Sequence, residues 1–143
     1  MKKVSRTLLG FVLASMFILS SCGEKVEKRK EWLSAGPWKM VNFEASGSSI
    51  IEYFASCDLD NEYSFVDGGD YSVMEGKTLC DTSDWDIVSL GTWDMSPEFD
   101  EISIETSYYN TTFTIVEMSD IELVVEGYDG LWEAGGRVTY NRK

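Results

Sequence analysis

From residue 38 to the end of the chain, apolar and polar residues alternate in short runs. The apolar positions are mostly aromatic or β-branched, and they recur at every second residue. This period is typical of β-strands with one buried and one solvated face, because successive side chains of a strand point to opposite sides. The alternating sets are Tyr63 and Phe65; Tyr71 and Val73; Trp93 and Met95; Ile102 and Ile104; Phe113 and Ile115; Ile121, Leu123 and Val125; and Val138 and Tyr140.

Turn-forming residues separate these runs, and the connections that they predict are short. The breaks fall at residues 67–69, 96–100, 118–120 and 128–136, and no segment keeps a helical period over three turns. We therefore expect an all-β fold, an up-and-down antiparallel β-barrel of about eight strands, because closing the sheet leaves no edge exposed. A β-sandwich is the alternative, with residues 75–86 as its longer crossing connection.

The N-terminal region predicts a targeting segment and a linker. Lys2, Lys3 and Arg6 precede an apolar run over residues 8–19, a pattern typical of a secretory signal and short for a transmembrane helix. The sequence Leu-Ser-Ser-Cys then ends at Cys22 and resembles the lipobox of bacterial lipoproteins, which implies lipidation of that cysteine. An ordinary cleaved signal is the alternative. We expect a lipoprotein signal peptide over 1–21, a flexible tether over 22–31 and a barrel domain over 32–143. The expected location is the bacterial cell envelope, anchored at the outer membrane and facing the periplasm or the surface.

With Cys22 assigned to the lipid, Cys57 and Cys80 are the two cysteines left to pair. They flank an expected β-hairpin over residues 62–74, whose Asp-Gly-Gly turn has glycines for positive φ angles. In an oxidising compartment such a pair most often forms one structural disulfide. The two cysteines lie at the same open end of the hairpin, and this placement also favours the bond. Zinc is disfavoured because the chain has no histidine. The acids after Cys57 do not follow the calcium-loop pattern, so we expect no metal site.

The composition excludes several classes of binding partner and of catalytic mechanism. The formal net charge of −13 argues against binding to nucleic acid and against adhesion to anionic headgroups. The absence of histidine excludes catalytic triads built on it, and no glycine-rich phosphate loop is present. Carboxylate pairs for glycoside hydrolysis stay open, because 25 acidic residues offer many partners. We expect a protein without cofactor or enzymatic activity.

An ordered set of motifs connects the chain with a family. Gly36-Pro37-Trp38-Lys39, the hairpin region from Cys57 to Tyr71, then Cys80, then Gly91-Thr92-Trp93 follow one another after the lipobox. This arrangement resembles the small lipocalin-like lipoproteins of Bacteroidetes-type bacteria. The resemblance implies an up-and-down barrel in which a basic residue near the end of the last strand covers the tryptophan of the first. Arg142, or else Arg137, would stack on Trp38 in that way.

Two functions follow as hypotheses. In the first, the barrel binds a small apolar or amphipathic ligand in the envelope, and an interior cavity of roughly a few hundred Å³ would favour this function. Its candidate pocket residues, which otherwise only fill the core, are Phe65, Tyr71, Trp93, Ile104 and Phe113. In the second, a filled barrel presents the loop 128–136, with exposed Leu131 and Trp132, to a protein partner, for example as an inhibitor.

Overall fold

The computed structural model of the protein describes residues 28–80 and 86–142. Residues 28–34 are helical, and the rest is almost entirely β-structure. The strands are β1 (Trp38–Ala45), β2 (Ser48–Ser49), β3 (Glu62–Phe65), β4 (Asp70–Met74), β5 (Ile87–Met95), β6 (Glu101–Thr106), β7 (Asn110–Met118), β8 (Glu122–Asp129) and β9 (Ala134–Arg142). A 3₁₀ turn, η1 (Ile51–Tyr53), and a one-turn helix, α2 (Ser56–Leu59), lie between β2 and β3.

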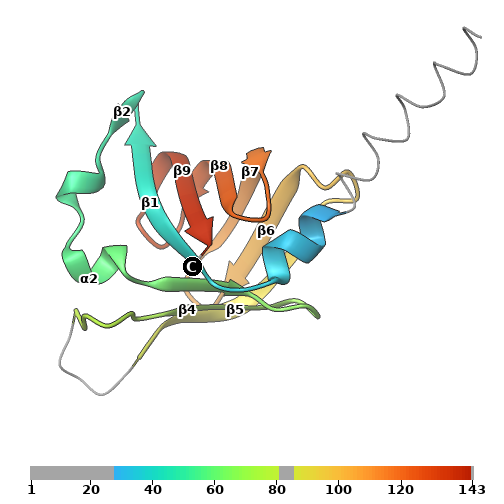
Figure 1. Ribbon diagram of the computed structural model, residues 1–143, viewed down its shortest axis with the longest axis horizontal. Helices are drawn as coiled ribbons and strands as arrows, with labels where there is room; N and C mark the ends of the chain where they lie inside the picture. The colour runs from blue at the N-terminus through green and yellow to red at the C-terminus, as the bar shows by residue number, and fades with distance from the viewer. Residues whose placement is uncertain (1–27, 81–85, 143) are drawn as a thin grey trace, which may run out of the picture.

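The strands form a closed antiparallel barrel (Figure 1). From β3 to β9 each strand pairs with the next along the chain, and β1 closes the ring between β9 and β3. Two-residue β2 only extends the end of β1, so the ring has eight strands. The prediction of an up-and-down barrel is confirmed, and the β-sandwich alternative is wrong. Short connections explain the outcome, because neighbouring strands pair before any crossing is needed.

The predicted alternation places the apolar set inside the barrel. All five candidate pocket residues and Trp38 belong to one buried cluster with the other inward-facing side chains. Ile121 is an exception, because it lies in the turn before β8 and is exposed. The hairpin of β3 and β4 forms as predicted, with Gly68 and Gly69 at positive φ in its turn. The disulfide between Cys57 and Cys80 is also confirmed, with 5.2 Å between the Cα atoms.

The N-terminal helix covers one end of the barrel, which we call the helix end. In Figure 1 it is the blue helix beside the strands. Arg29 Nη1 donates a 2.8 Å hydrogen bond to the Phe99 carbonyl, and Lys30 Nζ lies 5.6 Å from the ring centroid of Trp93. The boundary of the expected tether at residue 31 is therefore wrong, because residues 28–31 are helical and both Arg29 and Lys30 contact the barrel. The signal peptide, Cys22 and the rest of the tether lie outside the described residues.

At the helix end, Trp38 is fully buried, and its Nε1 donates a 2.9 Å hydrogen bond to the Leu33 carbonyl. The guanidinium carbon of Arg142 lies 4.8 Å from the Trp38 ring centroid, and the same side chain donates to the Trp32 carbonyl. Arg137 instead lies outside the barrel in an ion pair with Glu126. Arg142 therefore joins the last strand, the first strand and the helix.

Replacing Arg142 with alanine tests this junction. We expect Arg142→Ala to lower the free energy of unfolding by about 1–3 kcal/mol, because it removes a cation–π contact and a hydrogen bond to a carbonyl. Arg137→Ala is the matched control, since its exposed ion pair contributes only about 0–1 kcal/mol. Urea unfolding followed by tryptophan fluorescence measures both. Equal losses in the two variants would contradict a special role for Arg142.

Candidate functional site

Up-and-down strand order sends alternate connections to opposite ends of the barrel. The connections after β1, β4, β6 and β8 therefore meet at the end away from the helix, which we call the loop end. The disulfide also lies there, since it joins α2 to the segment after β4. The N-terminal helix covers the opposite end, and two residues that line the interior cavity, Tyr109 and Asp129, lie at this end.

The interior cavity has a volume of about 20 Å³. Its wall is aromatic and aliphatic apart from the hydroxyl groups of four tyrosines and the carboxylate of Asp129. A cavity of this volume accommodates about one water molecule. Four of the five pocket residues predicted from the sequence line it: Phe65, Tyr71, Ile104 and Phe113.

Trp93, the fifth predicted pocket residue, does not line this cavity. Its Nε1 donates a 2.9 Å hydrogen bond to the Val66 carbonyl at the helix end, and its ring meets that of Phe65 edge-on at 5.7 Å. The indole therefore fills the part of the barrel nearest the helix end. Its role is to close the helix end together with Trp38.

Buried polar groups gather in the half of the barrel nearer the loop end, which we call the upper half. Among the described residues, Asn61, Ser89 and Asp129 are the polar or charged residues that are buried, each at most 3% exposed. The strand register aligns Tyr63, Val73 and Ser89 in one row across β3, β4 and β5, facing inward. Within the described part of the chain, neither Ser89 Oγ nor Asn61 Oδ1 has a hydrogen-bond partner. Buried polar atoms without a partner are uncommon and often indicate a site for water or a ligand.

Asp129 ends β8 and is held by the turn that follows. Its Oδ1 accepts hydrogen bonds from the backbone N–H groups of Leu131 at 2.8 Å and Trp132 at 3.2 Å. This local arrangement is the one that aspartate commonly forms with residues two or three positions on. Burial raises the pKa of the Asp129 carboxyl, and the two N–H donors only partly oppose the rise. None of the described residues that line the cavity is basic.

Four tyrosine side chains surround the cavity together with Asp129: Tyr63, Tyr71, Tyr109 and Tyr140. Burial is the main cause that raises the pKa of each phenol. For Tyr63, Tyr109 and Tyr140 the nearby negative charge of Asp129 raises the pKa further. The hydroxyl of Tyr63 also accepts a 3.3 Å hydrogen bond from Trp132 Nε1. These phenols therefore remain neutral throughout the physiological range.

Tyr109 and Gly130 meet over the cavity at the loop end. A Cβ atom added to Gly130 would lie 2.6 Å from the ring of Tyr109, so the ring rests directly on this glycine. Tyr109 is half-buried and lies close to Ser89 and Tyr71, although Ser89 Oγ stays outside hydrogen-bonding geometry. Tyr109 is thus the side chain between the cavity and solvent, and it sits in a short turn between β6 and β7.

The expectation that Leu131 and Trp132 are exposed is wrong. Both are half-buried and pack against the core. The Trp132 ring meets Phe54 edge-on at 5.1 Å, and Phe54 in turn lies 5.7 Å from Phe43. The loop after β8 is therefore folded down over the barrel, where it helps to cover the cavity.

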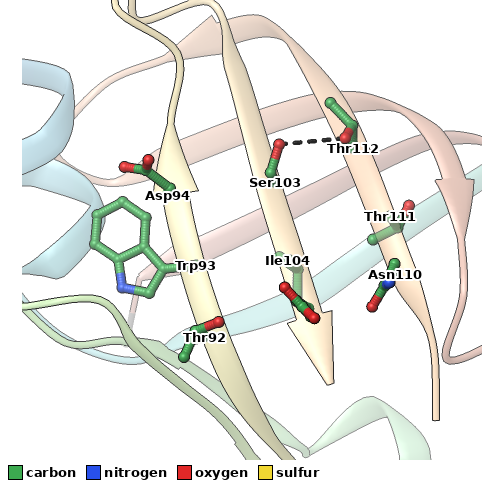
Figure 2. A pocket seen from close by; sticks show the side chains of 9 residues that line it. Thr92, Trp93, Asp94, Ser103, Ile104, Asn110, Thr111 and Thr112 are labelled. Atoms are coloured by element: carbon green, nitrogen blue, oxygen red, sulfur yellow. Dashed lines mark hydrogen bonds between the residues drawn. The ribbon is translucent and has the colours of Figure 1, made fainter. Parts of the chain in front are cut away.

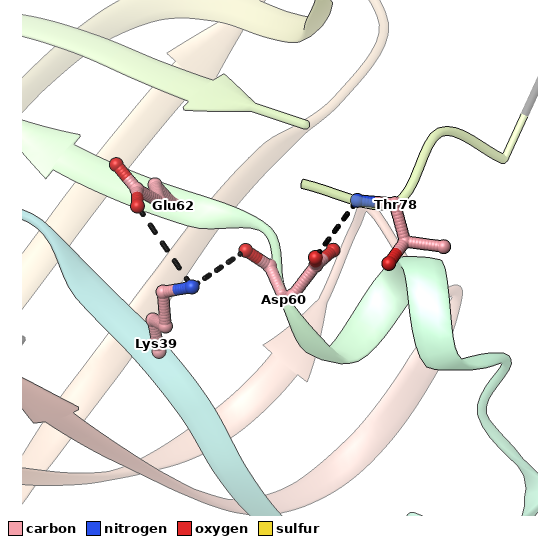
Figure 3. Close-up of polar contacts among 4 residues, drawn as sticks. All are labelled: Lys39, Asp60, Glu62 and Thr78. Atoms are coloured by element: carbon pink, nitrogen blue, oxygen red, sulfur yellow. Dashed lines mark hydrogen bonds and ion pairs between the residues drawn. The ribbon is translucent and has the colours of Figure 1, made fainter. Parts of the chain in front are cut away.

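The disulfide region supports the loop end but does not form a metal site. Lys39 Nζ donates to the Asp60 carbonyl at 3.1 Å and lies 3.8 Å from Glu62, while Asp60 Oδ2 accepts from the Thr78 N–H at 2.9 Å (Figure 3). These contacts tie β1, α2 and the segment after β4 together. The ligand atoms of Cys57, Asp58 and Cys80 lie within 4.8 Å of one another. The two sulfur atoms are bonded to each other, however, and provide no thiolate.

A second hollow lies on the outer face of β5, β6 and β7 (Figure 2). It is an open groove of about 360 Å³ among short polar side chains. The hydroxyl groups of Ser103 and Thr112 lie 3.2 Å apart across it, whereas the Trp93 and Ile104 side chains are buried. Such a surface is the ordinary solvated face of an antiparallel sheet. The interior cavity is therefore the better candidate site.

A closed barrel of eight antiparallel strands defines a class of barrels whose interior is either filled by side chains or holds one small ligand. The family model described as Lipocalin-like domain matches residues 35–125, well over half of the chain. The protein therefore belongs to the lipocalin-like domain family. No curated protein matches the chain. In the part that the structure describes, no helix is both long and apolar enough to span a membrane.

The buried charge of Asp129 predicts a pH-dependent stability. A raised pKa means that the folded chain binds this proton more tightly than the unfolded chain, so ionisation at neutral pH destabilises the fold. An asparagine at this position would keep an Oδ1 acceptor for both N–H groups without the charge. We expect Asp129→Asn to be more stable than the wild type at neutral pH. The difference should disappear once the pH falls below the usual aspartate value of 3.8, where both states are protonated.

Urea unfolding at several pH values measures this difference. Glu105→Gln is the matched control, because Glu105 is an exposed carboxylate on the outer face of β6. A loss of stability in Asp129→Asn at neutral pH that disappears in acid would instead show that the carboxylate charge is favourable for folding.

Proposed function

We propose that the protein is a non-enzymatic, lipid-anchored lipoprotein of the bacterial envelope whose barrel binds a small apolar or amphipathic ligand. The supporting observation is the interior cavity, with an aromatic wall and the buried carboxylate of Asp129. Membership in the lipocalin-like family is compatible with this function. Ligand sites of this kind combine an apolar wall with a few polar groups that orient the ligand.

The cavity is far smaller than the few hundred Å³ that a drug-sized ligand occupies. Binding therefore requires a side chain to leave the barrel. Tyr109 is the side chain best placed to do so, because it is half-buried, belongs to a short turn and rests on Gly130 rather than on a strand. A displaced Tyr109 would connect the cavity to solvent at the loop end without breaking the strand pairing.

Lipidation at Cys22 would also orient the domain. Only five residues separate Cys22 from Lys28, where the described helix begins. An extended chain of that length spans roughly 20 Å at about 3.5 Å per residue. The helix end would then face the membrane, and the loop end with its cavity would face away from it.

A protein partner is the second candidate function, because three exposed tyrosines lie at the loop end. Tyr53, Tyr108 and Tyr128 are 79%, 86% and 55% exposed, and they belong to three different connections or strand ends there. Exposed tyrosines are enriched at protein interfaces. Under this alternative the barrel is a rigid support, and the cavity holds water only.

Gly130→Ala tests whether Tyr109 controls access to the cavity. The new methyl group would displace the ring, so we expect a loss of about 1–3 kcal/mol in stability from overpacking. We also expect the neutral probe N-phenyl-1-naphthylamine to associate several-fold faster, measured by stopped-flow fluorescence. Gly135→Ala is the matched control, since its Cβ would meet no heavy atom closer than 3.9 Å among the described residues. Probe binding that is undetectable in all three proteins, together with no binding of a cationic ring compound, would argue against the ligand-binding function.

Replacement of Cys22 tests the anchor separately. We expect Cys22→Ser to abolish incorporation of labelled palmitate and to move the protein from the membrane fraction to the soluble fraction of the cells that express it. Cys57→Ser with Cys80→Ser is the control, because these residues form the disulfide and should not affect labelling. Labelled Cys22→Ser protein would show that the lipid is attached elsewhere.

A further inference from the structure

Among the described residues, those that line the cavity beneath the loop end carry one negative charge and no positive one. We propose that the ligand of this cavity is a small organic cation, a protonated amine, held by Asp129 among the tyrosine rings. This inference rests on the proposed ligand-binding function and specifies its ligand class.

The carboxylate of Asp129 is the first element of the site. The side chain is only 3% exposed, and both of its hydrogen bonds to described residues use Oδ1. Oδ2 is therefore left for a ligand. The ion pairs that the structure shows, Lys39 with Glu62 and Arg137 with Glu126, lie elsewhere. A buried carboxylate without a cationic partner is unfavourable, and a protonated amine would supply the missing charge.

The aromatic rings are the second element. The ring centroids of Tyr63 and Tyr140 lie 5.1 Å apart, and those of Tyr71 and Phe65 lie 5.2 Å apart. Several aromatic rings therefore border one small space. The face of an aromatic ring attracts a cation, and sites for ammonium ligands commonly use such rings. The rings also exclude water, which strengthens the attraction between the cation and Asp129.

Unpaired acceptors are the third element. Ser89 Oγ lies in the upper half of the barrel, in the row of Tyr63, without a hydrogen-bond partner in the described part of the chain. Asn61 Oδ1 is likewise unpaired there. Asn61 directly precedes β3 and is buried, two residues before the inward-facing Tyr63. Neither residue lines the cavity itself, so a primary ammonium group, which has three donors and no acceptor, would find its acceptors there in Asp129 and the phenol oxygens.

Other ligand classes fit this cavity less well. A neutral apolar ligand would leave the charge of Asp129 unpaired, and an anion would be repelled by it. The overall charge of −13 also attracts cations towards the protein. The groups that face Asp129 from β3, β4, β9 and the turn before β7 are phenols whose pKa is raised. Asp129 is thus the group of this cavity that changes charge below neutral pH.

Three probes that share one ring test the charge preference. Benzylamine is cationic, benzyl alcohol is neutral and benzoate is anionic at neutral pH. By titration calorimetry we expect benzylamine to bind at least about tenfold more tightly than benzyl alcohol, and benzoate to show no binding, because only the amine pairs with the carboxylate. Asp129→Asn should weaken benzylamine binding by about tenfold and leave benzyl alcohol unchanged. Glu105→Gln should change neither affinity.

A pH series on the wild type keeps the test valid if Asp129→Asn does not fold. Benzylamine affinity should fall as acid protonates Asp129, while benzyl alcohol affinity stays constant. Equal affinity for benzylamine and benzyl alcohol, with no effect of Asp129→Asn or of pH, would overturn the cation preference and leave the ligand-binding function intact. If no ring compound binds and N-phenyl-1-naphthylamine also fails, the ligand-binding function is overturned with it.

Discussion

Closure of the barrel through Trp38 is the constraint on which the rest of the structure depends. Its backbone pairs with Tyr63 of β3 on one side and with Arg142 of β9 on the other. Its side chain then fills the helix end, where Leu33 and Arg142 hold the indole. The pairing between β1 and β3 rests on this one register position, so the long pairing with β9 carries most of the closure. Without this closure, the inward side chains would lie on an open sheet.

Closure also explains why the cavity lies at one end. The two buried indoles of Trp38 and Trp93 occupy the barrel near the helix, whereas the upper half contains tyrosines and small polar residues. At Gly136 of β9 a Cβ atom would lie 2.1 Å from the Glu44 carbonyl oxygen, so only glycine allows the two strands to approach there. The interior is therefore filled by indole rings on one side and polar on the other.

The sequence predicts the inward residues well because alternation is a local property of a strand. The hairpin, the disulfide and the closed ring follow from turn residues, cysteine spacing and short connections. Asp129 and Tyr109 were missed because Asp129 is the last residue of a strand and Tyr109 lies in a turn, where polarity ordinarily indicates exposure. Their burial depends on loops folding back over the barrel. Trp132 was placed outside for the same reason, since its partner Phe54 is 78 residues away in the chain. Long-range contacts of this kind leave no periodic signal.

The buried polar residues near the loop end of the barrel oppose folding stability. Buried Asp129, with unpaired Ser89 and Asn61 above the apolar core, combines several features that cost free energy in an empty barrel. Natural proteins commonly tolerate such features where function needs them. The same desolvation that makes an unpaired carboxylate unfavourable strengthens its attraction for a cation that reaches it. A ligand without a positive charge would leave the carboxylate unpaired. The interaction that destabilises the empty barrel therefore favours binding of a cation over other ligands.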